Sequence, residues 1–253
     1  MSIELRQTNH LIDCKQEKLL SSLVKVAFWL LVLLFLPQII LSLLFGVFFG
    51  FWQAGEVTTN SFNTWYSTMP VLLTLSLISP VLTIPLLMKA TNAENWPDRF
   101  NLWAIKAMVV SLTAKWLMVG FVFWLTSSFV GEWLKLPEEQ FVLDIKAAGN
   151  SVGMVVLISF TLCVIIPIME ELIFRGWLFT KVEQTQLGSI GALILTAILF
   201  TIIHSQYENN VTFIMLLFFG LLLGYTRYKS NNISYSIAIH ILFNGLAYIV
   251  MFL

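Results

Sequence analysis

Long apolar runs are the feature that most constrains how this chain can fold. A helix needs about 20 apolar residues to cross the hydrocarbon core of a bilayer. Seven such runs are present, near residues 25–52, 68–88, 104–130, 151–175, 189–204, 211–227 and 233–253. Because 58% of the 253 residues are hydrophobic and only 11% are charged, a soluble globular class is excluded. The sequence predicts an all-α fold, a polytopic bundle of about seven or eight transmembrane helices with no soluble domain.

One polar stretch divides the chain into two transmembrane parts. Residues 131–150, GEWLKLPEEQFVLDIKAAGN, are amphipathic and interrupted by a proline, so we expect a connector that lies along the membrane surface. The run at 25–52 is too long for the apolar region of a cleaved signal peptide and is predicted to be a retained span. The expected parts are therefore an N-terminal segment at 1–24, N-terminal spans at 25–130, the connector at 131–150 and a second transmembrane part at 151–253.

The basic residues gather in alternate segments between the runs. They precede the first span, lie between the second and third, and follow the fourth and the sixth: Arg6, Lys15, Lys18, Lys25, Lys89, Arg99, Lys106, Arg175, Lys181, Arg227 and Lys229. The opposite segments hold only Lys135 and Lys146. The positive-inside rule then predicts a multi-pass protein of the plasma (inner) membrane with a cytoplasmic N-terminus and an extracytoplasmic C-terminus. The net charge of zero argues against a nucleic-acid or strongly acidic partner and leaves membrane lipids as expected partners.

The stretch IPIMEELIFRGWLF, residues 166–179, places two carboxylates and an arginine inside the fourth run. Ionisable side chains in a span are costly, and their presence there is by itself a hypothesis of function. Glu171 and Arg175 are four residues apart on one helix and are expected to pair, whereas Glu170 points about 100° away around the helix axis. A pair that only pins a helix end at the interface would account for Glu171 and Arg175, but not for the second carboxylate.

Two further segments place polar side chains inside apolar runs. LFTIIHSQYENN has Phe200 and His204 four residues apart near the end of the fifth run, and SIAIHILFN puts His240 and Asn244 on one face of the last. A lone histidine near a span end is more often an interfacial residue, and two polar groups on one span can be satisfied across the bundle. Together with Glu170, these groups could satisfy one another around a single cavity.

Turn positions support this convergence for one pair of residues. Glu170 lies 17 residues before Leu187 and His204 lies 17 residues after it, so a turn near Leu187 places both at one depth on adjacent antiparallel helices. His240 lies nine residues and Asn244 thirteen residues past a turn near Asn231. That spacing leaves an offset of roughly 6 to 12 Å, which helix tilt or unequal turn heights would have to absorb.

These three segments carry a resemblance to a known family. EELIFR, FTIIH and HILFN resemble the EExxxR, FxxxH and HxxxN/D motifs of the CPBP family, the CAAX prenyl endopeptidases and bacteriocin-processing proteins also called the Abi family. The motifs occur in the family's order, and the intervening FFGLLLGYTRYKSNNIS resembles its Gly-rich span and turn. The likeness covers about the last hundred residues, so the part at 151–253 is expected to be a CPBP-type core. It departs at Glu208, where some members carry an asparagine.

The resemblance implies a CAAX-type intramembrane endopeptidase whose expected partner is a membrane-associated peptide or protein substrate. Amide hydrolysis needs a nucleophilic water, stabilisation of the tetrahedral oxyanion and a proton for the leaving amine. In this interpretation Glu170 is the base that activates the water, and His204 shares that water and passes protons.

The remaining motif residues take supporting roles in the same interpretation. His240 and Asn244, as donors on one helix face, would form the oxyanion pocket. The pair of Glu171 and Arg175 would orient the neighbouring base. All six residues are therefore candidate catalytic residues.

A metal-dependent alternative stays open. Some members of the family have been called metalloproteases, and Glu170, His204 and His240 have the ligand number of a catalytic zinc centre. The chain lacks HExxH, the spacing that places two zinc ligands on one helix with a base between them. No cofactor is certain; a metal-free glutamate mechanism is slightly preferred, and Zn²⁺ is the alternative.

Other function classes compete with the protease. The same polar cluster could serve a non-catalytic bacteriocin-immunity or scaffold protein, or a proton-coupled transporter. A proton relay is usually strung through the whole bundle or repeated in inverted halves, yet the first three spans offer only Lys115, beside the interfacial Trp116. Nothing in the sequence marks a prenyl groove. The polar run SQYENN after His204 favours an extracytoplasmic opening, whereas the likeness to prenyl proteases favours the cytoplasmic face.

Overall fold

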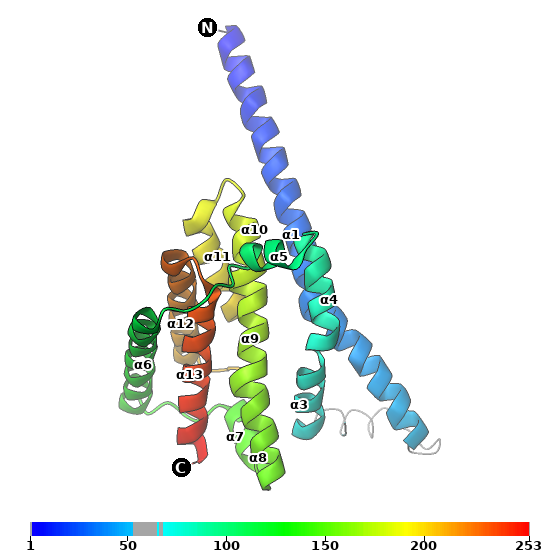
Figure 1. Ribbon diagram of the computed structural model, residues 1–253, viewed down its shortest axis with the longest axis vertical. Helices are drawn as coiled ribbons and strands as arrows, with labels where there is room; N and C mark the ends of the chain where they lie inside the picture. Colours follow the sequence, from blue (N-terminus) through cyan, green and yellow to red (C-terminus); the bar gives the residue numbers. More distant parts are fainter. Residues whose placement is uncertain (1, 53–64, 66–67, 253) are drawn as a thin grey trace.

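The computed structural model describes the backbone of residues 2–52, 65 and 68–252, and the side chains of residues 19–51, 65 and 68–252. Within these ranges the regular elements are all helices (Figure 1). The all-α prediction is therefore confirmed. The elements are α1 Ser2–Trp52, α3 Met69–Ile78, α4 Pro80–Thr91, α5 Trp96–Leu102, α6 Val110–Trp133, α7 Gln140–Ala148, α8 Val152–Phe160, η1 Thr161–Ile165, α9 Ile166–Glu171, η2 Leu172–Leu178, α10 Phe179–Glu183, α11 Gly188–Ile202, α12 Asn210–Ser230 and α13 Ile233–Phe252.

The helical runs agree with the predicted transmembrane bundle. In the described part of the chain, six stretches are long and apolar enough to cross a bilayer: Leu19–Phe51, Met69–Thr91, Val110–Trp133, Val152–Glu183, Asn210–Ser230 and Ile233–Phe252. A seventh apolar helix, α11, has 15 residues and matches the predicted run at 189–204. At 1.5 Å per residue it is about 22 Å long, shorter than the ~30 Å hydrocarbon core. Every predicted run thus has a helical counterpart.

The third span begins later than the sequence indicated. Instead of starting at residue 104, helix α6 starts at residue 110, and residues 104–109 form a non-helical segment, here called the strap, that leads from α5 to α6 (Figure 1). The Ala104 carbonyl accepts a hydrogen bond from Ile233 N at 2.9 Å, and the Lys106 carbonyl accepts one from Asn232 Nδ2 at 3.2 Å. These bonds to the start of α13 occupy strap carbonyls that a helix would use internally.

Helix α1 is much longer than a membrane is thick. Its 51 residues correspond to about 76 Å. The apolar part is Leu19–Phe51, and the preceding residues continue the same helix beyond the rest of the bundle (Figure 1). The sequence predicted a separate segment at 1–24 with basic side chains, of which Arg6, Lys15 and Lys18 lie outside the described side chains.

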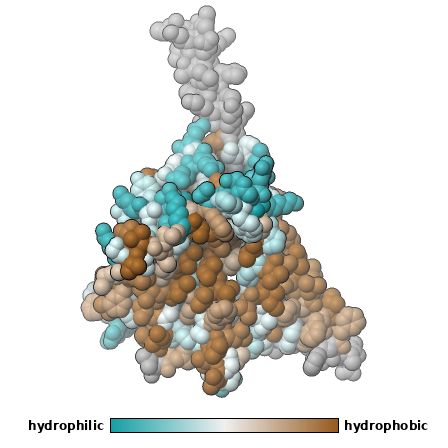
Figure 2. Space-filling model, viewed as in Figure 1, coloured by the Kyte–Doolittle hydropathy of each residue, from teal (hydrophilic) through white to brown (hydrophobic). Residues whose placement is uncertain are grey.

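The connections between helices define two opposite ends of the bundle. One end, here called the basic end, holds α5, the strap and the turns at 184–187 and 231–232 (Figure 1). Hydrogen bonds from Thr180 Oγ1 to the Leu102 carbonyl and from Lys181 Nζ to the Thr91 carbonyl tie these connections together. Figure 2 shows hydrophilic side chains gathered at this end above an apolar band. The connector helix α7 lies toward the other end (Figure 1), and the backbone of Glu208 and Asn209, after α11, donates hydrogen bonds to Glu139 just before α7.

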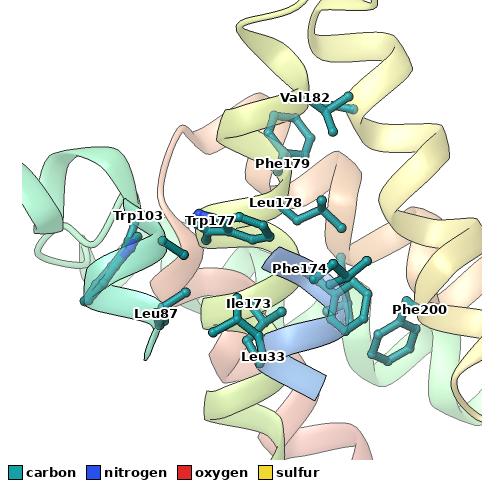
Figure 3. Close-up of a cluster of buried hydrophobic side chains, with 14 of the residues drawn as sticks. Leu33, Leu87, Trp103, Ile173, Phe174, Trp177, Leu178, Phe179, Val182 and Phe200 are labelled. Atoms are coloured by element: carbon teal, nitrogen blue, oxygen red, sulfur yellow. The ribbon is translucent and has the colours of Figure 1, made fainter. Parts of the chain in front are cut away.

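One apolar cluster joins the N-terminal helices to the second transmembrane part. Leu33 of α1, Leu87 of α4 and Trp103 pack with Ile173 and Phe174 of η2 (Figure 3). Because lipid tails are as apolar as these side chains, close van der Waals packing rather than exclusion of water holds such helices together in a membrane. The cluster fixes the helix that carries the two glutamates.

Glycines allow α11 and α12 to approach closely. A Cβ atom on Gly220 would lie 3.3 Å from both the Cα and the carbonyl oxygen of Ala197, and one on Gly224 would lie 3.5 Å from the Leu193 carbonyl oxygen. Small residues at helix interfaces permit this approach. The approach brings the Gly220 carbonyl to the buried end of Arg175.

Candidate active site

The helix that carries the glutamates changes register twice. Residues 152–183 form one continuous span in which η1 and η2 are π-helical, with α9 and its glutamates between them. Pro167 follows η1 and has no N–H to donate, which favours a local change of hydrogen bonding. At the end of each π segment, a backbone N–H donates to the carbonyl five residues earlier instead of the one four residues earlier. The carbonyl four residues earlier is then free to accept a hydrogen bond from another donor.

The first freed carbonyl accepts a hydrogen bond from a predicted site residue. Ile166 N donates to the Thr161 carbonyl rather than to that of Leu162. Asn244 Nδ2, from α13, donates instead to the Leu162 carbonyl at 2.9 Å. This bond uses one of the two amide N–H donors of Asn244, a side chain that also lines the cavity beside Glu170.

The second freed carbonyl accepts a hydrogen bond from a buried arginine. The sequence argument did not include this arginine in the site. Phe179 N donates to the Phe174 carbonyl, and Arg227 Nε donates to the Arg175 carbonyl at 3.2 Å. Arg227 lies in the last turn of α12 and is only 4% exposed. Its contact therefore ties α12 to the π-helical segment next to the glutamates.

The predicted pairing of Glu171 with Arg175 is present. Arg175 Nη1 donates to Glu171 Oε1 at 3.0 Å, and both side chains are fully buried. Arg175 Nη2 donates to the Gly220 carbonyl at 2.9 Å, and the guanidinium lies 4.4 Å from the centre of the Phe200 ring. The pair is thus an internal anchor of the bundle rather than an interfacial contact.

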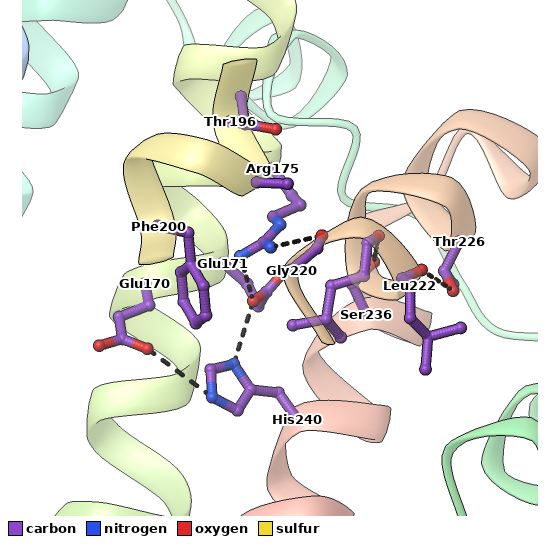
Figure 4. A network of polar contacts seen from close by, with 12 residues as sticks. Glu170, Glu171, Arg175, Thr196, Phe200, Gly220, Leu222, Thr226, Ser236 and His240 are labelled. Atoms are coloured by element: carbon purple, nitrogen blue, oxygen red, sulfur yellow. Dashed lines mark hydrogen bonds and ion pairs between the residues drawn. The ribbon is translucent and has the colours of Figure 1, made fainter. Parts of the chain in front are cut away.

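Glu170 faces two imidazoles, as Figure 4 shows for His240. Its Oε1 lies 3.6 Å from His204 Nε2 and its Oε2 lies 3.7 Å from His240 Nε2. The expected gathering of carboxylate and imidazole groups from three helical segments is therefore found. Both distances exceed the usual hydrogen-bond length, so the carboxylate oxygens keep acceptor capacity for a further molecule.

The FxxxH spacing fixes the His204 tautomer. His204 N donates to the Thr201 carbonyl, and His204 Nδ1 lies 2.7 Å from the Phe200 carbonyl. Because a carbonyl can only accept, Nδ1 carries the proton and neutral His204 presents Nε2 as an acceptor toward Glu170.

His240 is held by the other glutamate. Its Nδ1 lies 3.0 Å from Glu171 Oε1, so the Glu171–Arg175 pair contacts His240 (Figure 4). From the sequence, we expected this pair to orient Glu170. In the structure, it orients His240, whose Nε2 then faces Glu170.

Two cavities meet at the Glu170 carboxyl group. The first has a volume of about 290 Å³ and lies between η1, α7, α12 and α13, with Glu170, His204, His240 and Asn244 in its wall. The second, of about 210 Å³, lies between α1, the α3–α4 pair and α9 and also includes Glu170. The first cavity joins the polar residues of all three motifs.

Comparison with known proteins agrees with this arrangement. Residues 152–246 match the Rce1-like family. The matching family model is described as type II CAAX prenyl endopeptidase Rce1-like, and the matched range contains all six predicted site residues. The likeness to CAAX prenyl endopeptidases of the CPBP family is thus confirmed for residues 152–246, and the described helices from α1 to α7 lie outside the match.

A curated relative matches as well. An uncharacterized 24.3 kDa protein from Escherichia coli is 29% identical over 140 residues, which cover 54% of this chain and 58% of the relative. The match thus spans little more than half the length of either protein. No solved structure matches.

The cavity wall also contains residues that the sequence argument missed. Tyr207 lies three residues after His204, and its ring is nearly parallel to the imidazole, at 13° and 6.4 Å between centres. Burial raises the pKa of the Tyr207 phenol to about 12, with the negative charges of Glu170 and Glu139 adding to the effect, so the hydroxyl remains a donor at neutral pH. Its place in SQYENN, beside a motif histidine, is a signal that could have identified it.

The connector also contributes to the site. Phe141 and Ile145 of α7 line the first cavity. Glu139, just before α7, accepts hydrogen bonds from Glu208 N and Asn209 N at 2.9 and 3.3 Å. Glu208, where the chain departs from the family pattern, thus contacts the connector through its backbone N–H. Its side chain is exposed.

The polar cluster has the residue types of a zinc site but not the arrangement of one. Glu170, His204 and His240 supply the donor atoms of a His₂Glu zinc site, and both Nδ1 atoms are held by other acceptors, as metal-bound imidazoles usually are. Within the described residues, however, no group of three His, Cys, Asp or Glu side chains is arranged to hold a metal ion. As placed, the three side chains do not fit a metal centre.

Proposed function

We propose that this protein is an intramembrane endopeptidase that hydrolyses a peptide bond of a membrane-associated or prenylated peptide or protein. The observation that carries the proposal is the position of Glu170, whose carboxylate lies on a cavity wall between two imidazole Nε2 atoms at 3.6 and 3.7 Å. The Rce1-like match of the same segment supports the reaction class.

Glu170 is suited to act as the general base. A water beside its carboxylate can lose a proton to it while attacking the scissile carbonyl carbon. Neutral His204 presents Nε2 on the same side and can accept a hydrogen bond from that water. After attack, the proton held by Glu170 or His204 passes to the departing amine, so that the C–N bond breaks as a neutral amine leaves.

His240 and Asn244 are suited to stabilise the oxyanion. The buried cluster holds two carboxylates and one guanidinium, so a protonated His240 between the carboxylates would balance the charge. In that state Nδ1–H donates to Glu171 and Nε2–H points into the cavity. Asn244 has a second amide N–H beyond the one bound to Leu162, which gives a second donor near the same wall.

The charges around the cluster favour hydrolysis over proton transport. From Glu171 toward the basic end, the next buried ionisable groups in contact are Arg175 and Arg227. Guanidinium groups stay protonated in proteins and do not pass protons along. A relay through the second transmembrane part would therefore end at Arg175.

We place the protein in the plasma membrane with the basic end toward the cytoplasm, according to the positive-inside rule. The α7 residues of the first cavity lie toward the opposite end, which would then face outward (Figure 1). Cysteine substitutions at Ser205 and Ser230, labelled in intact cells with a membrane-impermeant reagent, test this orientation. Labelling at position 205 alone is expected, and labelling at position 230 alone would reverse it.

The deciding experiment is cleavage by the purified full chain with Glu170→Gln. Glutamine keeps the size of the side chain but cannot accept the proton, so cleavage of a membrane-anchored peptide library containing prenylated members should fall about 10²- to 10⁴-fold. Substrate binding should persist. Glu132→Gln, an exposed position at the end of α6, is the control and should leave cleavage unchanged.

Unchanged cleavage in Glu170→Gln would defeat the assignment. The immunity, scaffold or transport function would then be the leading explanation of the polar cluster.

A further inference from the structure

A third cavity lies at the basic end of the bundle, away from the glutamates. It has a volume of about 370 Å³ and lies between the strap, the first turns of α6 and the turn that joins α12 to α13. Neither Glu170 nor any other candidate catalytic residue is in its wall. We call it the strap pocket. Its wall includes Lys106, Lys115, Trp116, Lys229, Asn232 and Tyr235.

The strap pocket concentrates positive charge without a protein counter-ion. Lys106, Lys115 and Lys229 come from the strap, α6 and α12. In the described part of the chain, no carboxylate lies within ion-pair distance of these three ammonium groups. Lys229 lies against the aromatic faces of Tyr225 and Tyr228, at 5.7 and 5.4 Å. Three exposed ammonium groups around one cavity give it a positive potential that favours an anion.

The helix that starts at the strap pocket adds to this potential. Helix α6 is 24 residues long, and its N-cap residue Val109 makes no side-chain capping bond. The positive end of the helix dipole and its first N–H groups therefore face the same region, which favours an anionic group. Neutralisation of a helix C-terminus would explain Lys229 in the last turn of α12, but not Lys106 or Lys115.

The position of the strap pocket indicates a lipid rather than a soluble anion. It lies where three apolar helices end, because α6 begins at residue 110, α12 ends at residue 230 and α13 begins at residue 233. Trp116 and Tyr225 pack edge to face beside it, as aromatic side chains do at headgroup level. The neighbouring side chains of Val110 and Leu112 are 85% and 44% exposed and present an apolar surface on which acyl chains can lie.

We propose that the strap pocket binds the phosphate-bearing headgroup of an anionic glycerophospholipid. The three lysines surround the phosphate, Asn232 and the hydroxyl of Tyr235 line the polar floor, and the acyl chains follow the exposed side of α6. Because the strap is hydrogen-bonded to the α12–α13 turn, the bound lipid also holds α6 against α13, the helix that carries His240 and Asn244.

Native mass spectrometry of the full chain in a neutral detergent tests this proposal. Phosphatidylglycerol and phosphatidylcholine with identical acyl chains are the two lipid probes, and glycerol phosphate is the soluble probe. One phosphatidylglycerol should be retained with at least about 10-fold preference over phosphatidylcholine, and glycerol phosphate should not compete for it. Each of Lys106→Gln, Lys115→Gln and Lys229→Gln should weaken retention about 5-fold, and the triple variant should remove the preference.

Lys89→Gln is the matched control, because Lys89 is exposed at the same end but is not part of the pocket wall. It should retain phosphatidylglycerol like the parent protein. Equal retention of the two lipids, an undiminished preference in the triple variant, or an equal loss in Lys89→Gln would each overturn the proposal. Competition by glycerol phosphate would replace the lipid by a soluble phosphate as the ligand. If the triple variant fails to fold, the single variants decide the outcome.

Discussion

Asn244 Nδ2 donates a hydrogen bond of 2.9 Å to the Leu162 carbonyl, which the π-helical turn η1 leaves without its usual helical partner. The last motif of the chain is thus anchored on the irregular part of the helix that carries the first motif. A local departure from α-helical geometry creates a specific acceptor between the two elements, and the proposed oxyanion donor is positioned by it.

This relationship predicts a double effect of Asn244→Ala. Loss of the amide leaves the buried Leu162 carbonyl unpaired, which should cost about 1–3 kcal/mol of folding free energy. It also removes an oxyanion donor, which should lower kcat by roughly 10²- to 10³-fold. Thermal unfolding and cleavage assays in the same detergent measure both. A variant with reduced stability but full activity would confine Asn244 to a structural role.

The buried pair of Glu171 and Arg175 should show strong coupling. Glu171→Gln leaves the guanidinium buried without its charge partner and should cost about 3–5 kcal/mol, as should Arg175→Met. The double variant should be more stable than the sum of the single losses predicts, because it leaves no isolated charge. Unfolding measurements on the four proteins give the coupling energy.

The exposed ion pair of Lys146 with Glu138 is the control for these unfolding measurements. Glu138→Gln should change the free energy of unfolding by less than about 1 kcal/mol. A Glu171→Gln protein that stays fully stable yet loses all cleavage would contradict the assignment and would make Glu171 the base instead of Glu170.

Gly220 should not tolerate a side chain. A methyl group there would lie 3.3 Å from the backbone of Ala197, forcing α11 and α12 apart and shifting the carbonyl that binds Arg175. Gly220→Ala should therefore destabilise the protein by about 1–3 kcal/mol and reduce cleavage. Gly131, in α6, has open space around it, so Gly131→Ala should be neutral or stabilising by up to ~1 kcal/mol. Equal unfolding midpoints for the two variants would contradict the close approach.

Tyr207 should contribute to substrate contact through its hydroxyl. The phenol lines the cavity beside His204 and, with its pKa raised to about 12, stays protonated over the neutral range. Tyr207→Phe should lower kcat/KM roughly 3- to 10-fold by the same factor at every neutral pH, with little change in stability. Tyr228→Phe, at the basic end, should have no effect. An unchanged rate in Tyr207→Phe would place the hydroxyl outside the substrate contact.

Cleavage should withstand removal of metal ions. The carboxylate faces both imidazoles directly, and no three-residue metal group is formed among the described residues. Dialysis against a strong chelator should therefore leave the rate within about 2-fold of its starting value, a change too small to reflect the loss of a catalytic Lewis acid. Loss of activity that zinc alone restores would overturn the metal-free mechanism.

The sequence by itself determined the contacts that depend on spacing along one helix or across one short turn. Four residues separate Glu171 from Arg175 and Phe200 from His204, and both pairs meet because residues four apart lie on the same helix face. Equal distances from the turn near Leu187 likewise predicted that Glu170 and His204 would meet.

Tertiary structure decided the contacts between helices that are distant in the chain. For regular helices, the spacing left His240 about 12 Å out of register with Glu170. The structure closes this gap to 3.7 Å, and η2, which lies between Glu170 and its turn, contributes because a π turn holds an extra residue. The partner of Asn244, the contact of Glu171 with His240 and the non-helical strap follow from the same inter-helix packing. The apolar runs in the sequence determine which segments form helices. The tilt and register of those helices, and which backbone carbonyls are free to accept a hydrogen bond, depend on how closely neighbours such as α11 and α12 can approach.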